Sequence, residues 1–180
     1  MINLEKQGES KAINLDKNSS IEAVTATLSW TAAVDLDLHA FVGTKSGKFK
    51  HYFFGDKGDL KRSPYIELDG DEGVGNTGGD NQEQMRLATL SDVDYVFFAC
   101  NIFRFFGFLN SGDNFSKYDG KVTVVTNAGD NIRVPMTSST PGKWCLIAGI
   151  VNKSGAPSVV NVNRVMSSEP SERDILALLN

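Results

Sequence analysis

The chain has 180 residues, a mass of 19.6 kDa, a formal net charge of −4 and an isoelectric point of about 5.2. This length suits one domain with a buried core and is short for two. The acidic balance argues against nonspecific nucleic-acid binding, which needs a basic face to displace counterions from phosphates. A hydrophobic content of 41% and a charged content of 22% are ordinary for a soluble globular protein.

Short segments in which apolar and polar residues alternate predict half-buried β-strands. The clearest is 21–30, where valine, alanine, leucine and tryptophan alternate with threonine and serine. A hairpin is indicated at Asn127-Ala128-Gly129-Asp130, between two such segments. Residues 101–109 are rich in phenylalanine, and we interpret them mainly as core. Strands are expected at 12–15, 21–30, 36–42, 50–54, 65–68, 85–90, 95–98 and onward, 121–126, 132–135, 144–151 and 158–165.

The end of the chain has a different pattern, because Ser168-Glu169-Pro170-Ser171-Glu172 is a helix-start signal followed by a leucine-rich stretch. It predicts an amphipathic helix of about three turns with Pro170 in its first turn. This helix is expected to pack on the rest, to dock on a partner or to fray. We therefore predict an all-β fold, a β-sandwich of two antiparallel sheets with long acidic loops over 1–167, and a short C-terminal helical tail over 168–180.

Two acidic stretches are candidates for metal binding. Asp35 and Asp37 are two residues apart on a predicted strand, so their carboxylates project from one face and repel each other unless a cation separates them. Residues 69–81 hold five glycines and form an unusually long predicted loop. Aspartate, asparagine and glycine are also common turn residues without any metal, but the two stretches together favour a calcium site. The oxygen donors in and beside the loop are Asp69, Asp71, Glu72, Asn76, Asp80, Asn81 and Glu83.

Three motifs occur in one order: Asp35-Leu36-Asp37 in a strand, the acidic Gly-rich loop, and Gly142-Lys143-Trp144 near the end. Together they resemble the TerD family of tellurium-resistance and stress-response proteins, over about residues 2–151. The resemblance implies a β-sandwich and bound calcium. By position, it implies metal ligands drawn from Asp35, Asp37, Asp71, Asp80 and Glu83, with Asp69 and Asn81 as weaker candidates.

The loop departs from the family pattern in two ways. It has one extra residue between Asp71 and Glu83, and Asn81 stands where the family has a second aspartate. Losing a carboxylate is expected to weaken the site or to change the number of ions bound. The helical tail is also not a feature of the resemblance, so the chain is interpreted as a divergent member.

The expected function is a non-catalytic calcium-binding module of the tellurium-resistance and stress-response type, which acts through calcium-ordered loops on an unidentified protein partner. One alternative is a metal-dependent hydrolase with His39 as its base. Another is a structural or assembly role, for example in a phage particle, with the tail as the contact. No nucleophile elbow is present, and the one formal Gly-rich match, at 73–78, lies among acidic residues and has no predicted helix after it.

The chain begins without the apolar core of a signal peptide, and no apolar run approaches the ~20 residues that cross a bilayer. We therefore expect a cytoplasmic protein without a membrane span, and peripheral membrane association is left open. Cys100 and Cys145 lie in apolar runs and are expected to be buried thiols that act as small hydrophobes. A disulfide between them is the alternative in an oxidising compartment.

Overall fold

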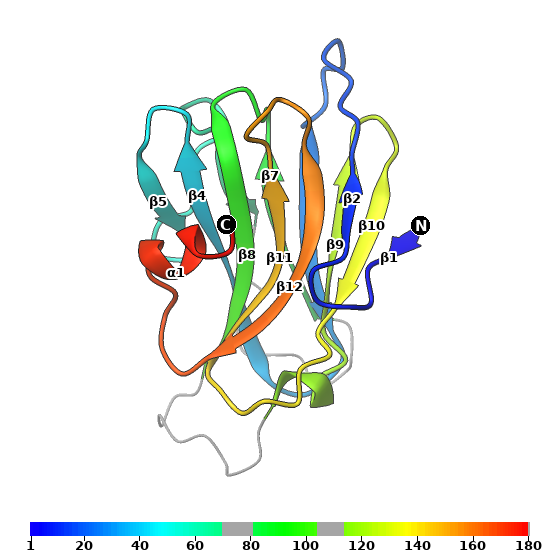
Figure 1. The fold of residues 1–180 in the computed structure, drawn as a ribbon, viewed down its shortest axis with the longest axis vertical. Helices are drawn as coiled ribbons and strands as arrows, with labels where there is room; N and C mark the ends of the chain where they lie inside the picture. Colours follow the sequence, from blue (N-terminus) through cyan, green and yellow to red (C-terminus); the bar gives the residue numbers. More distant parts are fainter. Residues whose placement is uncertain (70–80, 104–113, 180) are drawn as a thin grey trace.

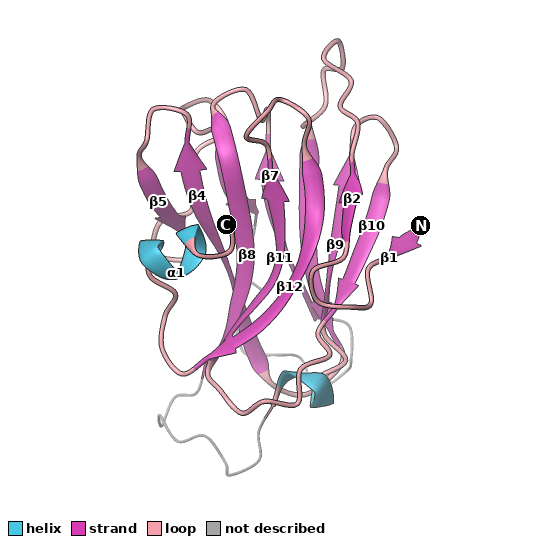
Figure 2. Ribbon diagram, in the orientation of Figure 1, coloured by secondary structure: helices cyan, strands magenta, loops and turns pink. Residues whose placement is uncertain are grey.

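The computed structural model describes residues 1–69, 81–103 and 114–179. Two sheets pack face to face with little helix (Figures 1 and 2). The β3 sheet has the order β1-β10-β9-β3-β7-β6, and the β8 sheet has the order β2-β12-β11-β8-β4-β5. Among the described strands, the pairings are antiparallel except that of β1 with β10. The predicted β-sandwich is therefore confirmed.

Each of the two sheets contains six of the described strands. The β3 sheet contains β1 (Ile2–Asn3), β3 (Val24–Trp30), β6 (Ile66–Asp69), β7 (Asn81–Leu87), β9 (Lys121–Thr126) and β10 (Asn131–Pro135). The β8 sheet contains β2 (Ser10–Ala12), β4 (Asp35–Thr44), β5 (Phe49–Tyr52), β8 (Val93–Phe103), β11 (Trp144–Val151) and β12 (Ser158–Met166). Two short helices complete the description, the 3-10 turn η1 (Phe115–Lys117) and α1 (Glu172–Leu176).

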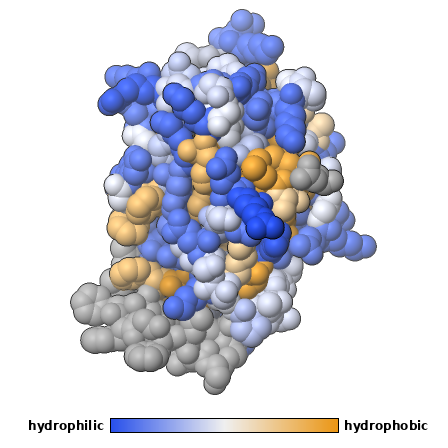
Figure 3. Space-filling model, turned by 60° about the vertical axis from the view of Figure 1, so that its left-hand side comes forward, coloured by the Kyte–Doolittle hydropathy of each residue, from blue (hydrophilic) through white to orange (hydrophobic). Residues whose placement is uncertain are grey.

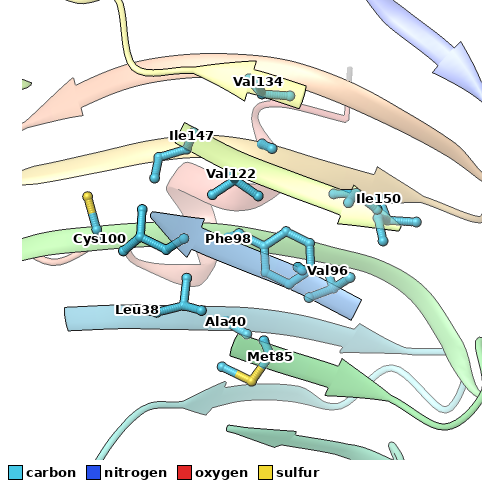
Figure 4. Close-up of a cluster of buried hydrophobic side chains, with 14 of the residues drawn as sticks. Leu38, Ala40, Met85, Val96, Phe98, Cys100, Val122, Val134, Ile147 and Ile150 are labelled. Atoms are coloured by element: carbon cyan, nitrogen blue, oxygen red, sulfur yellow. The ribbon is translucent and has the colours of Figure 1, made fainter. Parts of the chain in front are cut away.

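The core lies between the two sheets, and the alternation of apolar residues places it there. In β3 every second side chain is buried, as the period of two in the sequence predicts. Figure 4 shows Leu38, Phe98 and Ile147 of the β8 sheet meeting Met85 and Val122 of the β3 sheet. The packing of these apolar side chains is what holds the two sheets together.

The outer face of the β8 sheet has a second, smaller apolar cluster. Phe41, Tyr95, Phe97 and Trp144 belong to it, and Ile175 of α1 is fully buried in it. This cover explains why β8 and β11 are apolar on both faces and do not alternate. Of the three fates predicted for the tail, packing on the sandwich is the one observed.

The predicted strands are found: 121–126 and 144–151 have the predicted bounds, and the others are shifted at one or both ends. The first was predicted at 12–15, but β2 is Ser10–Ala12, because its pairing with β12 stops at Ala12. β7 begins at Asn81, four residues earlier than predicted, because it pairs with β3 along the whole length of β3. Of the predicted loop, Asp69 ends β6 and Asn81 begins β7, and residues 70–80 lie outside the described residues. Residues 104–109 of the phenylalanine-rich segment also lie outside them.

The C-terminal helix is shorter than predicted. The prediction of three turns is wrong, because α1 spans only Glu172–Leu176. Pro170 lies before the N-cap residue Ser171 and not in the first turn. Figure 3 shows the side on which α1 lies, where the hydrophobic patches are small and separated by hydrophilic residues. No helix in the described part of the chain has the length and apolar character needed to cross a membrane.

The capping box of α1 leads to a prediction about the docking of the tail. The Ser171 side chain accepts the Asp174 backbone N–H, and the Asp174 side chain accepts the Ser171 N–H at 2.9 Å. Ser171→Ala is expected to destabilise α1 by about 1 kcal/mol, so its amides should exchange roughly fivefold faster with deuterium. Ser171→Asn keeps a capping oxygen and is the control. Equal exchange in all three proteins would contradict a role for the cap.

Candidate metal site

Glu83 connects the two sheets at one end of the sandwich. It projects from β7 toward the interior with a side chain that is only 4% exposed, and its Oε2 accepts the backbone N–H of Leu38 in β4 at 2.6 Å. β5 pairs with β4 only over Ala40–Gly43, so the backbone N–H of Leu38 is not used by β5 and donates to the Glu83 side chain from the other sheet. The buried carboxylate of Glu83 therefore lies against the backbone of β4.

Asp37 is the residue before Leu38 and is also buried, with 8% exposure. Its strand position is opposite Asn101 in β8. Burial raises the pKa of the Cys100 thiol well above its usual value, and the charges of Cys145, Glu83 and Asp37 raise it further. Glu83 and Asp37 therefore approach the same stretch of β4 from different sides, because Glu83 accepts the Leu38 N–H from the inner face while Asp37 shares the outer face of β4 with His39 and Phe41.

Two more predicted ligands, Asp35 and Asn81, are the first residues of β4 and β7. Asp35 is half-buried at the start of β4 and faces the same side as Asp37. Asn81 is buried at the start of β7, opposite Trp30, and its Nδ2 lies 3.5 Å from the carbonyl oxygen of Ala32. Asp35 and Asp37 thus lie on the outer face of β4, and Asn81 and Glu83 on the inner face of β7. Both strands begin at the lower end of the sandwich in Figure 1.

Asp69 lies elsewhere. It is exposed on the outer face of the β3 sheet, and its Oδ2 is 3.4 Å from Nε of Arg86. Glu83 projects from the inner face of the same sheet, so the two carboxylates are separated by the sheet. Asp71 and Asp80 lie outside the described residues. In residues 1–69, 81–103 and 114–179, no three histidine, cysteine, aspartate or glutamate side chains form a group able to hold a metal ion.

His39, the candidate base of a hydrolase, is buried and belongs to a stack of aromatic rings. Its Nδ1 is 2.8 Å from Nε2 of His51, and its Nε2 is 3.2 Å from Oδ1 of Asn101. Its ring stacks on those of His51 and Phe53. Burial, and then the charge of His51, lower the pKa of His39 from 6.5 to about 3, against a raising effect of the Asn101 hydrogen bond. A general base is most effective with a pKa near the working pH, so this geometry favours a structural role.

The sequence did not predict the contact between this stack and the tail. Nδ1 of His51 lies 3.2 Å from Oε1 of Glu169, which precedes α1. Burial lowers the pKa of His51, while the charges of Glu169 and Asp56 raise it. No local pattern signals such a pair, because 118 positions of sequence separate its members (169 minus 51).

The two cysteines are both free and buried, which confirms the prediction of small hydrophobic thiols. They occupy paired positions in β8 and β11. Burial raises the pKa of Cys145 to about 12. A thiol that stays protonated is a poor nucleophile, so neither cysteine is a candidate reactive group.

Comparison with solved structures gives two close matches in shape. The first is the crystal structure of SAV2460, a protein of unknown function, with a TM-score of 0.60 and 18% identity over 87% of this chain and 96% of that one. The second is a homologue of the telluride resistance protein TerD, SCO6318 from Streptomyces coelicolor A3(2), with a TM-score of 0.57 and 18% identity over 84% and 94%. The chain has a TerD-like fold.

This likeness confirms, at the level of the fold, the resemblance seen in the motifs. No family model matches the sequence, and no curated protein matches it. Neither of the two similar structures is described as an enzyme.

Proposed function

We propose that this chain is a non-catalytic, calcium-binding module of the tellurium-resistance and stress-response type that acts on a protein partner. The observation that carries the proposal is the pair of buried carboxylates, Asp37 and Glu83, which come from opposing sheets and meet at the Asp37–Leu38 stretch of β4, where Glu83 accepts the Leu38 N–H. The TerD-like fold supports the choice of family. The free state of both cysteines fits a reducing compartment, so we propose the cytoplasm.

A cation fits this end of the sandwich for an electrostatic reason. Two carboxylates removed from water repel each other and are costly unless positive charge or hydrogen-bond donors compensate them. Calcium prefers carboxylate and amide oxygens, and Asp37, Glu83 and Asn81 supply both kinds. When bound, the ion would supply charge and order to the chain around it.

We further propose that Asp35, Asp71 and Asp80 supply the remaining ligands. Asp35 shares a face with Asp37, and Asp71 and Asp80 belong to the segment that joins β6 to β7. Asp69 stays a weaker candidate, because Arg86 holds its carboxylate on the outer face. The partner would then contact the surface that calcium orders at this end.

The other two functions receive less support. A hydrolase would need a base, and the low pKa and occupied ring nitrogens of His39 do not suit that role. An assembly role through the tail would need α1 as a contact, but Ile175 packs on the chain's own β8 sheet. Deleting residues 168–180 tests that role, since an unchanged oligomeric state would remove it.

Calorimetric titration of calcium into chelator-stripped protein tests the proposal, with magnesium as the ion control. We expect one or two calcium ions to bind and the melting temperature to rise, because an ion that binds only the folded state stabilises it. Asp37→Asn and Glu83→Gln should each weaken calcium binding, on the order of tenfold or more, because each removes a charged ligand.

Glu67→Gln is the matched control. Glu67 is an acid of the same β3 sheet, but it faces outward and pairs with Arg86 at 2.9 Å, so its loss should leave the calcium affinity unchanged. Absence of calcium binding to the parent chain would refute the proposal. Unchanged binding in both Asp37→Asn and Glu83→Gln would refute these ligands.

A further inference from the structure

The end of the sandwich opposite the candidate metal site contains a cavity of about 520 Å³. It opens to solvent and is lined by the connections between β2 and β3, β4 and β5, β7 and β8, β9 and β10, and β11 and β12, which meet at the upper end of the molecule in Figure 1. Cavities of roughly 300–1,000 Å³ are typical of small-molecule sites.

The walls of this cavity are held by hydrogen bonds. Asn127 accepts the backbone N–H of Asp16 at 2.8 Å and donates to the carbonyl of Asp16 at 2.9 Å. Asn152 is buried and donates to the carbonyls of Leu90 and Val93, both at 2.9 Å. Side chains from β9–β10 and β11–β12 thus fasten two neighbouring connections, so the cavity is built into the fold.

Part of the lining is apolar. Leu15, Leu90 and Pro157 contribute to the wall, and Ile21 also lines the cavity although 61% of it is exposed. Contact with an apolar ligand would remove part of this exposed isoleucine surface from water, which is favourable. The lining therefore suits a molecule with a hydrocarbon or aromatic body.

The charged part of the lining is mainly basic. Lys17 and Lys45 come from two different connections, and neither lies within ion-pair distance of a carboxylate in the described part of the chain. The carboxylate in the lining belongs to Asp16, whose Oδ1 already accepts the N–H of Asn18 at 2.9 Å. In a protein with a net charge of −4, this cavity presents two lysines to one acid.

We propose that this cavity binds small organic anions that have an apolar body, of the class of medium-chain carboxylates. The lysine ammonium groups would attract the anionic head, while their hydrocarbon stems and the apolar wall would contact the body. An inorganic anion would leave the wall and Ile21 in water, and a neutral hydrocarbon would leave the lysines without a partner. The site is separate from the calcium site and does not depend on it.

A titration of the isotope-labelled protein with octanoate, followed by amide NMR shifts, tests the proposal. We expect saturable shifts confined to the connections that line the cavity, such as those at Ser19, Ser91 and Gly155. Binding should weaken as salt is added, because the lysines are exposed and screened. Octan-1-ol should bind roughly tenfold more weakly, and octylammonium should not bind.

Variants then test the role of the two lysines. The double variant Lys17→Met, Lys45→Met keeps the stems and removes the charges, and it should weaken octanoate binding by roughly tenfold. Lys48→Met is the matched control, since Lys48 lies in the same turn as Lys45 and does not line the cavity. Asp37→Asn should leave octanoate binding unchanged, which separates this proposal from the calcium site.

Three results would overturn the inference. One is the absence of saturable shifts in the lining amides with octanoate. Another is equal affinity for octan-1-ol and octanoate, which would show an apolar cleft without anion selection. The third is an equal loss of binding in Lys48→Met and in the double variant, which would show a general effect of surface charge.

Discussion

Replacing Phe98 by alanine is expected to lower the free energy of unfolding by about 3–5 kcal/mol. Phe98 is fully buried between the two sheets (Figure 4). Its neighbours in register on β4 and β11 are Ala40 and Ala148, whose side chains are too short to fill the space that the ring would leave. The variant should therefore retain most of the cavity, which places the loss in the upper part of the range. Urea unfolding measures it.

Val125→Ala is the control for this experiment. Val125 lies in β9 of the same sandwich, but it is an exposed position at 39%. Its truncation should change the free energy of unfolding by no more than about 0.5 kcal/mol. A loss below about 1 kcal/mol in Phe98→Ala would show that the core collapses around the missing ring and would contradict rigid packing of Phe98 between the sheets.

Acid is expected to destabilise the protein through His39. Its pKa is about 3 in the folded chain, below its ordinary value of 6.5. As the pH falls below 6.5, the unfolded chain takes up this proton first, and the equilibrium shifts toward unfolding. The contribution of His39 is thus complete above about pH 6.5 and declines toward pH 3, with a loss on the order of 3 kcal/mol between pH 7 and pH 4.

The pH slope of His39→Phe tests this expectation in calcium-free protein. Phenylalanine keeps an aromatic ring beside Phe53 and Trp144 but cannot take up a proton, so stability should fall less steeply between pH 7 and pH 4. His51→Gln should keep most of the slope, because burial is the larger cause of the His39 shift and the charge of His51 the smaller. Equal slopes in His39→Phe and the parent would exclude His39 as the source.

Local sequence patterns predicted some features of the tail and of the candidate metal site and missed others. The helix-start signal at 168–172 contains Ser171, the N-cap residue of α1, because capping by Ser171 and Asp174 is a local interaction, but it placed Pro170 inside the helix when it lies before the cap. The length of the helix was overestimated, since α1 ends at Leu176, and the burial of Ile175 against the β8 sheet is a contact that the local pattern does not show. In the same way, the motifs predicted Asp37 and Glu83 as metal ligands. They did not predict that Glu83 of β7 reaches the backbone of β4, because the two strands are far apart in the sequence.

The sequence by itself determined the all-β class, most of the strands and the buried thiols, since a period of two and apolar runs depend on neighbouring residues only. The tertiary structure alone decided that Glu83 reaches the backbone of Leu38 and that Asp69 faces Arg86 on the other side of the sheet. It also decided that His39 is held between His51 and Asn101, and that five connections line one cavity. These features arise from pairing and packing between distant segments, and no local pattern of residues encodes which segments meet.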